Sequence, residues 1–100
     1  MSVIVTMRVK GDTAKFRSWA ESSGDFMRKI SADAQAGGAI HHRFGVGDGF
    51  VLIVDEWDSV ESFQKFFQTN SDIPKLMEEA GARSEPQITF AEAIESPDQF

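Results

Sequence analysis

The chain of 100 residues contains no cysteine, no tyrosine and only three prolines. Without cysteine it has no disulfide bond, no thiolate nucleophile and no cysteine-ligated zinc site. Its aromatic residues are nine Phe and two Trp. Such an apolar aromatic set is typical of a packed core or of an apolar cavity, rather than of a hydrogen-bonding surface.

Basic residues and long apolar runs are also scarce. Ten Lys and Arg stand against sixteen Asp and Glu, which gives a net charge of −6. Because no basic stripe compensates for this charge, we expect no binding to nucleic acid. No stretch approaches the roughly 18 apolar residues of a membrane span, and the start MSVIVTMRVK is too short an apolar run for a signal peptide. We therefore expect a soluble cytoplasmic protein with no membrane partner.

The residue pattern predicts one domain over residues 1–95, followed by a tail over 96–100. Period-two apolar segments predict strands over 2–10, 39–46, 50–57 and 87–94. Helical spacing predicts helices over 13–35, from 58 onward and, as a short helix, over 74–80. Residues 22–25 weaken the first of these helices enough to allow two shorter helices in its place. The order β-α-β-β-α-β predicts a ferredoxin-like α+β sandwich with a four-stranded antiparallel sheet.

The strand FVLIVDEW, residues 50–57, is apolar on both faces until it reaches Asp55. A strand of this kind indicates that both faces of its sheet are covered. Since the predicted helices cover only one face, we expect the other face to meet a second copy of the chain in a homodimer.

The stretch FVLIVDEWDSVESFQKFF, from Phe50 to Phe67, resembles a strand and helix of the dimeric α+β barrel proteins, in particular the antibiotic-biosynthesis-monooxygenase-like group. In that group a strand ends in acid-x-Trp-acid and a helix with an aromatic face follows. The order of elements matches over residues 2–95. The resemblance implies a homodimer that forms an α+β barrel. Members of the group include cofactor-independent oxygenases of polycyclic aromatic compounds, haem-degrading enzymes and proteins without an assigned activity.

The haem-degrading branch of the group uses a His in the region of the second helix and an Asn on the first strand. Residues 58–80 of this chain contain no His, and positions 3–9 contain no Asn. We therefore disfavour haem degradation and expect no cofactor.

The hairpin around Asp48-Gly49 predicts which residues lie opposite one another. A type I′ turn at these two residues pairs His42 with Asp55, His41 with Glu56, Phe44 with Ile53 and Ile40 with Trp57. We assign Phe50, Leu52 and Val54 to the helix-covered face, although Arg43 then falls on that face and fits it badly. The opposite face is predicted to line a ligand cavity with Thr6, Arg8, Ile40, His42, Phe44, Val51, Ile53, Asp55, Trp57, Gln87, Thr89 and Ala91.

From this register we hypothesise that His42 is a general base held by Asp55, with Trp57, Phe44, Ile53, Arg8, Thr6 and Thr89 as substrate-binding residues. A carboxylate on one ring nitrogen fixes the tautomer, and the other nitrogen faces the substrate. Such a base in an apolar pocket suffices for a cofactor-independent monooxygenase of small aromatic or polyketide-like compounds.

Two alternatives concern His42 and Asp55, and a third concerns the whole protein. The pairing of His42 with Asp55 is also typical of an ordinary surface ion pair. A metal site shared with a partner chain lacks identifiable further ligands, so we predict no metal. The alternative for the whole protein is a non-catalytic ligand-binding or stress-related barrel.

Overall fold

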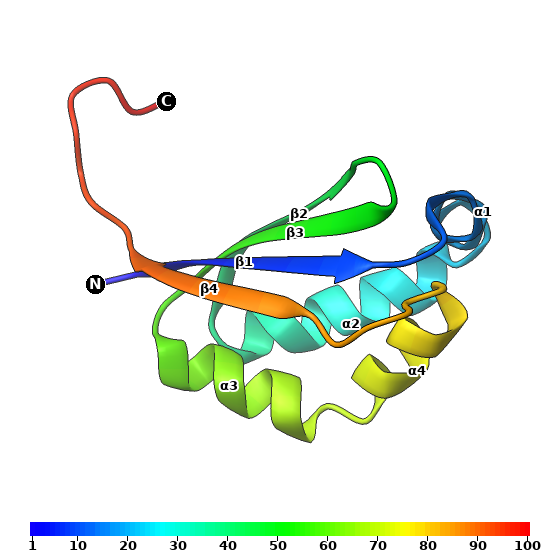
Figure 1. Cartoon of the computed structure of the whole chain (residues 1–100). Helices are drawn as coiled ribbons and strands as arrows, with labels where there is room; N and C mark the ends of the chain where they lie inside the picture. Colours follow the sequence, from blue (N-terminus) through cyan, green and yellow to red (C-terminus); the bar gives the residue numbers. More distant parts are fainter.

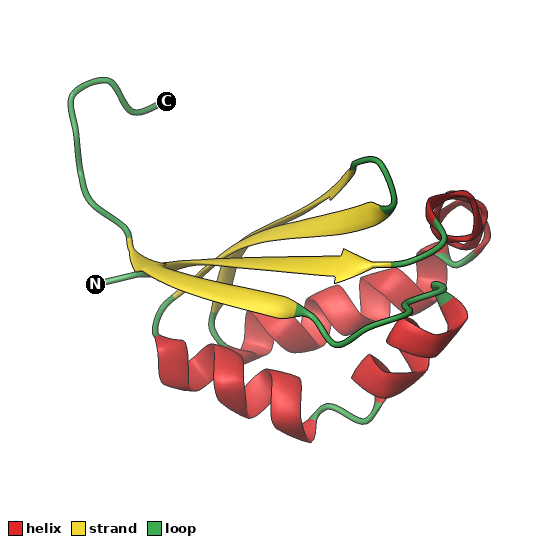
Figure 2. Cartoon of the chain, in the orientation of Figure 1, coloured by secondary structure: helices red, strands yellow, loops and turns green.

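The computed structural model describes all 100 residues and consists of a sheet with helices on one side (Figures 1 and 2). Its elements are β1 Val3–Lys10, α1 Thr13–Ser22, α2 Gly24–Gly37, β2 Ala39–Val46, β3 Phe50–Trp57, α3 Val60–Thr69, α4 Asp72–Glu79 and β4 Gln87–Glu92. The four strands lie in the order β2-β3-β1-β4 and all neighbours are antiparallel. The predicted ferredoxin-like fold is confirmed. None of the helices has both the length and the apolar character needed to cross a membrane.

The segment 13–35 forms two helices, which is the second of the two arrangements that its sequence allows. The Asp12 side chain accepts a hydrogen bond from the Lys15 amide at 3.0 Å and caps α1. Helix α1 ends at Ser22 and α2 begins at Gly24, where glycine and serine favour a break. Gly38 terminates α2 with a φ of 121°, a conformation that side chains with a Cβ rarely adopt.

Helix α3 presents its aromatic side chains to the sheet. Its N-cap is Ser59, whose hydroxyl accepts from the Ser62 amide at 3.1 Å. Phe63 packs edge-on against Trp57 with ring centroids 5.6 Å apart, and Phe66 lies 5.3 Å from the same indole. The core therefore sits between the sheet and the helices, and its buried members are Val5, Met7, Val9, Phe16, Trp19, Val51, Ile53, Trp57, Phe63 and Ala80.

The hairpin of β2 and β3 has the predicted register over most of its length. The predicted pairs His42–Asp55, His41–Glu56 and Phe44–Ile53 are confirmed. The prediction for Ile40 is wrong, because an irregularity between Ala39 and His41 brings Ala39 opposite Trp57 instead. The turn is not type I′, because Gly49 has a positive φ and Asp48 does not.

The predicted assignment of the two sheet faces is wrong. Val5 pairs with Asp55 and Met7 with Ile53, so the odd-numbered residues of β3 face the helices. We call this side the helix-covered face and the other the open face. The residues predicted for the helices but found on the open face are Phe50, Leu52 and Val54.

Two physical reasons account for the error. Strand β3 is apolar on both sides, so its pattern does not distinguish them. The carboxylate of Asp55 was predicted to line a cavity on the face opposite the helices, yet it is buried beneath them, where hydrogen bonds satisfy both of its oxygens. Arg43, which fits the helix-covered face badly, pairs with Val54 and lies on the open face.

Candidate functional site: a cavity under the sheet

A cavity of about 310 Å³ lies between the helix-covered face and helices α2, α3 and α4. This volume is at the lower end of the range found for small-molecule sites, about 300–1,000 Å³. Apolar side chains dominate its wall and include Met7, Met27, Ile53, Phe63, Phe66 and Met77. Three of the four methionines of the chain contribute. Because methionine is unbranched and flexible, this wall can adapt to the shape of a ligand.

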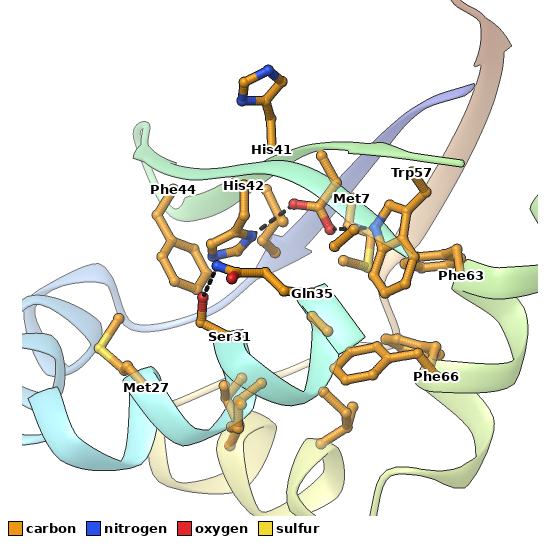
Figure 3. A pocket seen from close by; sticks show the side chains of 18 of the residues that line it. Met7, Met27, Ser31, Gln35, His41, His42, Phe44, Trp57, Phe63 and Phe66 are labelled. Carbon is orange, nitrogen blue, oxygen red and sulfur yellow. Dashed lines mark hydrogen bonds and ion pairs between the residues drawn. The ribbon is translucent and has the colours of Figure 1, made fainter. Parts of the chain in front are cut away.

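Three polar side chains form a hydrogen-bonded chain at one end of the cavity (Figure 3). His42 Nδ1 lies 2.7 Å from Asp55 Oδ1, and Trp57 Nε1 donates to Asp55 Oδ2 at 3.1 Å. The residues come from adjacent positions of β2 and β3, and the confirmed register places all three on the helix-covered face. The sequence prediction that His42 and Asp55 interact is therefore confirmed, on the face opposite to the one predicted.

Asp55 determines which ring nitrogen of neutral His42 carries the proton. Asp55 is 7% exposed and Trp57 is 1% exposed, so the indole is fully buried and the carboxylate is largely shielded from bulk water. An ionised carboxylate only accepts hydrogen bonds, so the neutral imidazole carries its proton on Nδ1 and leaves Nε2 as an acceptor. The His42 side chain is 41% exposed and extends from the strand toward α2, so the ring is accessible to a ligand (Figure 3).

The sequence-predicted binding residues divide into two groups. Phe44, Ile53 and Trp57 line the cavity with His42 and Asp55, and the Phe44 ring meets the imidazole edge-on with centroids 4.7 Å apart. The other three predicted residues, Thr6, Arg8 and Thr89, lie on the open face. There the Arg8 guanidinium lies 3.8 Å from the centre of the Phe50 ring. The prediction that these three share a face with His42 is wrong.

The two adjacent histidines do not form a joint site. His41 pairs with Glu56, and its ring points away from the cavity, to the other side of β2 (Figure 3). No group of three or more His, Cys, Asp or Glu side chains lies close enough together to hold a metal ion.

Sequence reasoning missed Arg28 of α2, which lines the cavity, and two further polar residues of the same helix, Ser31 and Gln35. Ser31 and Gln35 lie one turn apart, so they project from the same side of the helix. The signal that identifies them is their position beside the apolar stripe of α2, where Ile30 and Ala34 pack toward the sheet. A helical projection of the segment places both at the border of that stripe.

Two polar contacts outside the cavity join the helices that enclose it. Lys29 on α2 forms an ion pair with Asp72 at the start of α4, and the Asn70 side chain donates to Asp33 Oδ2 at 3.2 Å. The hydrogen bond that Lys29 donates to Asp72, together with the negative charge of that carboxylate, raises the pKa of the Lys29 ammonium above its ordinary value. These contacts hold α2 next to the segment that leads from α3 into α4.

Comparison with known proteins identifies the class to which this fold belongs. No protein-family model matches the chain, and no curated protein matches it in sequence. Among solved structures, the chain is similar to SnoaB, a cofactor-independent oxygenase from Streptomyces nogalater, with a TM-score of 0.65 and 13% identity over 98% of both chains. The fold is thus that of the antibiotic-biosynthesis-monooxygenase-like proteins, and the predicted resemblance is confirmed at the level of the fold.

Two further solved structures have the same arrangement of elements. A putative antibiotic biosynthesis monooxygenase from Caulobacter crescentus CB15 has a TM-score of 0.65 and 13% identity, covering 94% of this chain and 91% of that one. A dimeric ferredoxin-like protein from an uncultured marine organism has a TM-score of 0.62 and 15% identity, covering 95% and 93%.

Proposed function

We propose that this cytoplasmic protein binds a small aromatic or polyketide-like compound in the cavity and acts as a cofactor-independent monooxygenase, with His42 as the base. The observation that carries the proposal is the pairing of His42 Nδ1 with the buried carboxylate of Asp55 at 2.7 Å. This pairing leaves the second ring nitrogen free to accept a proton from a compound in an apolar cavity. The likeness in fold to a cofactor-independent oxygenase is in keeping with this role.

The proposed reaction converts an activated methylene group, such as that of an anthrone, to a ketone. His42 Nε2 removes a proton from the methylene carbon, and Asp55 stabilises the imidazolium that forms. The carbanion then reduces dioxygen in one-electron steps, and a carbon–oxygen bond forms. His42 returns its proton to the peroxide, which loses water and leaves the ketone. One molecule of dioxygen is consumed and one of water is formed for each ketone, so no external reductant is needed.

An oxygen electrode tests this proposal with a panel of anthrones and hydroquinones. The protein is first treated with a chelator and its metal content is measured. We expect uptake of one dioxygen for each anthrone converted to ketone, at the same rate before and after chelation. Specific binding of the panel without oxygen uptake would contradict the enzyme and favour the non-catalytic ligand-binding alternative.

We further propose that the open face of the sheet meets a second copy of the chain, giving a homodimer. Ile4 and Val54 are 39% and 42% exposed on this face, although both are large and apolar. A similar solved structure is itself described as a dimeric ferredoxin-like protein. In this dimer Thr6, Arg8 and Thr89 lie at the interface.

Analytical ultracentrifugation of wild-type protein and of Val54→Glu tests the dimer. We expect the wild type to sediment as a dimer and the variant to dissociate at least about tenfold more readily, because two carboxylates would be buried at the interface. An equivalent glutamate at exposed Gln64 on α3 is the control and should leave the dimer intact. A monomeric wild-type protein at micromolar concentration would contradict the proposal.

A further inference from the structure

Ser31 and Gln35 are the polar side chains that α2 contributes next to His42. Both line the cavity, and Figure 3 shows them facing the imidazole from the side opposite Asp55. The imidazole therefore lies between a buried carboxylate on one side and a hydroxyl and an amide on the other. The rest of the nearby wall is apolar, with Phe44 against the ring.

The hydrogen bond between Ser31 and Gln35 is weak. Gln35 Nε2 donates to Ser31 Oγ at 3.4 Å, which is longer than the usual range of about 2.7–3.2 Å for a bond of this type. The Ser31 hydroxyl proton and the second amide hydrogen of Gln35 make no other hydrogen bond in the structure. Two donors are thus available on the side of the imidazole that faces α2, and a ligand oxygen can replace the weak bond between them.

Removal of a proton by His42 leaves negative charge on the substrate. In a phenol or an enolisable ketone this charge is concentrated on an oxygen atom. An oxyanion in an apolar cavity is unfavourable unless fixed donors point at it, and such donors contribute large stabilisation because they need no reorganisation. Asp55 cannot serve, because it accepts hydrogen bonds and both of its oxygens are occupied.

We propose that Ser31 and Gln35 bind the oxygen of the substrate on which negative charge develops, and so select compounds that carry a hydroxyl or carbonyl group next to the reacting position. This inference rests on the proposed function of His42 for its catalytic consequence. Its binding consequence can be measured separately, on a compound that does not turn over.

The test uses two probes of similar shape, 1-naphthol and 1-methylnaphthalene, and measures their dissociation constants by calorimetry. We expect Ser31→Ala and Gln35→Ala each to weaken 1-naphthol binding by about five- to tenfold, which corresponds to one lost hydrogen bond. Binding of 1-methylnaphthalene should change by less than about twofold, and Ser31→Thr, which keeps the hydroxyl, should bind 1-naphthol like the wild type. Ser18→Ala and Gln64→Ala make the same changes on exposed helix surfaces outside the cavity and serve as controls.

Four outcomes separate this inference from the proposed function. Equal loss of both probes in Ser31→Ala and Gln35→Ala would indicate a packing role and overturn the inference, as would unchanged 1-naphthol binding. A wild-type protein that binds no 1-naphthol would also overturn it. Selective loss of 1-naphthol in a protein without oxygen uptake would support oxygen binding by this pair and contradict the oxygenase.

Discussion

Strand β3 is apolar on both faces of the sheet, but the polar groups of the two faces differ in how they are satisfied. On the helix-covered face, Asp55 is buried and receives hydrogen bonds from His42 and Trp57. At the next position of each strand, on the open face, Glu56 lies opposite His41 and accepts from the Ser2 hydroxyl at 2.6 Å. Each face thus carries one cross-strand pair of a histidine and a carboxylate, but only the covered pair lies in a cavity.

This difference shows that a histidine opposite a carboxylate is not by itself enough to make a functional pair. The His41–Glu56 and His42–Asp55 pairs each place an imidazole directly opposite a carboxylate across the same two strands. The covered pair differs because helices α2, α3 and α4 exclude water from one side of it and supply the cavity wall. Burial makes the hydrogen bonds of Asp55 costly to break and fixes the orientation of the imidazole.

The largest effect that we expect from this comparison is on stability. Trp57→Ala on the covered face should lower the free energy of unfolding by about 3–5 kcal/mol, because it opens a cavity in the core and removes a donor from Asp55. Val54→Ala on the open face should cost no more than about 2 kcal/mol even with the proposed partner copy packed on it, because only two methyl groups are removed. Urea unfolding of the two variants measures both values. Similar losses at the two positions would show that the faces do not differ in burial as described.

The next effect concerns the state of His42. In Asp55→Asn the amide oxygen can still accept from Trp57 Nε1, and the amide nitrogen then faces His42 Nδ1 and donates to it. We expect the neutral ring to shift its proton toward Nε2 and oxygen uptake to fall by about 100-fold. The ¹⁵N chemical shifts of the ring report the tautomer. Glu56→Gln makes the same change on the open face, and it should alter neither the His42 shifts nor the rate.

The smallest effect concerns the Lys29–Asp72 pair at the helix surface. Because Asp72 raises the pKa of Lys29 above its ordinary 10.5, the pair contributes stability below that pH and loses it as pH rises through the raised pKa. Lys29→Gln should lower the melting temperature by no more than about 2 °C at neutral pH, since the pair is exposed to solvent. The difference from wild type should shrink as the pH rises through the raised pKa of Lys29. Lys65→Gln on α3 is the control, and a difference that persists at high pH would contradict the account.

The fold could be predicted because each local signal agrees with it. The alternation of β1, the hairpin glycine at 49 and the helix caps at Asp12 and Ser59 together specify the order of elements. The pairing of His42 with Asp55 follows from that hairpin register. These features depend on residues close together in the sequence.

The side of the sheet on which the pair lies could not be predicted in the same way. It depends on how β1 aligns with β3, about 50 residues later, and β3 is apolar on both sides. Assigning Phe50, Leu52 and Val54 to the helix-covered face gave the wrong side. The face that carries Asp55 can lie under the helices because partners such as Trp57 satisfy the buried carboxylate. Arg43 was the residue that indicated the correct face, since an arginine on β2 belongs on the open side.

The central claim is that one of the two adjacent histidines, His42, is the base of an oxygenase. Oxygen uptake with an anthrone substrate, measured side by side for wild type, His42→Ala and His41→Ala, tests it most directly. We predict that His42→Ala loses at least about 100-fold in rate while His41→Ala stays within about twofold of wild type, since its ring points away from the cavity. A His42→Ala variant with the wild-type rate, or a His41→Ala variant that loses as much, would contradict the account.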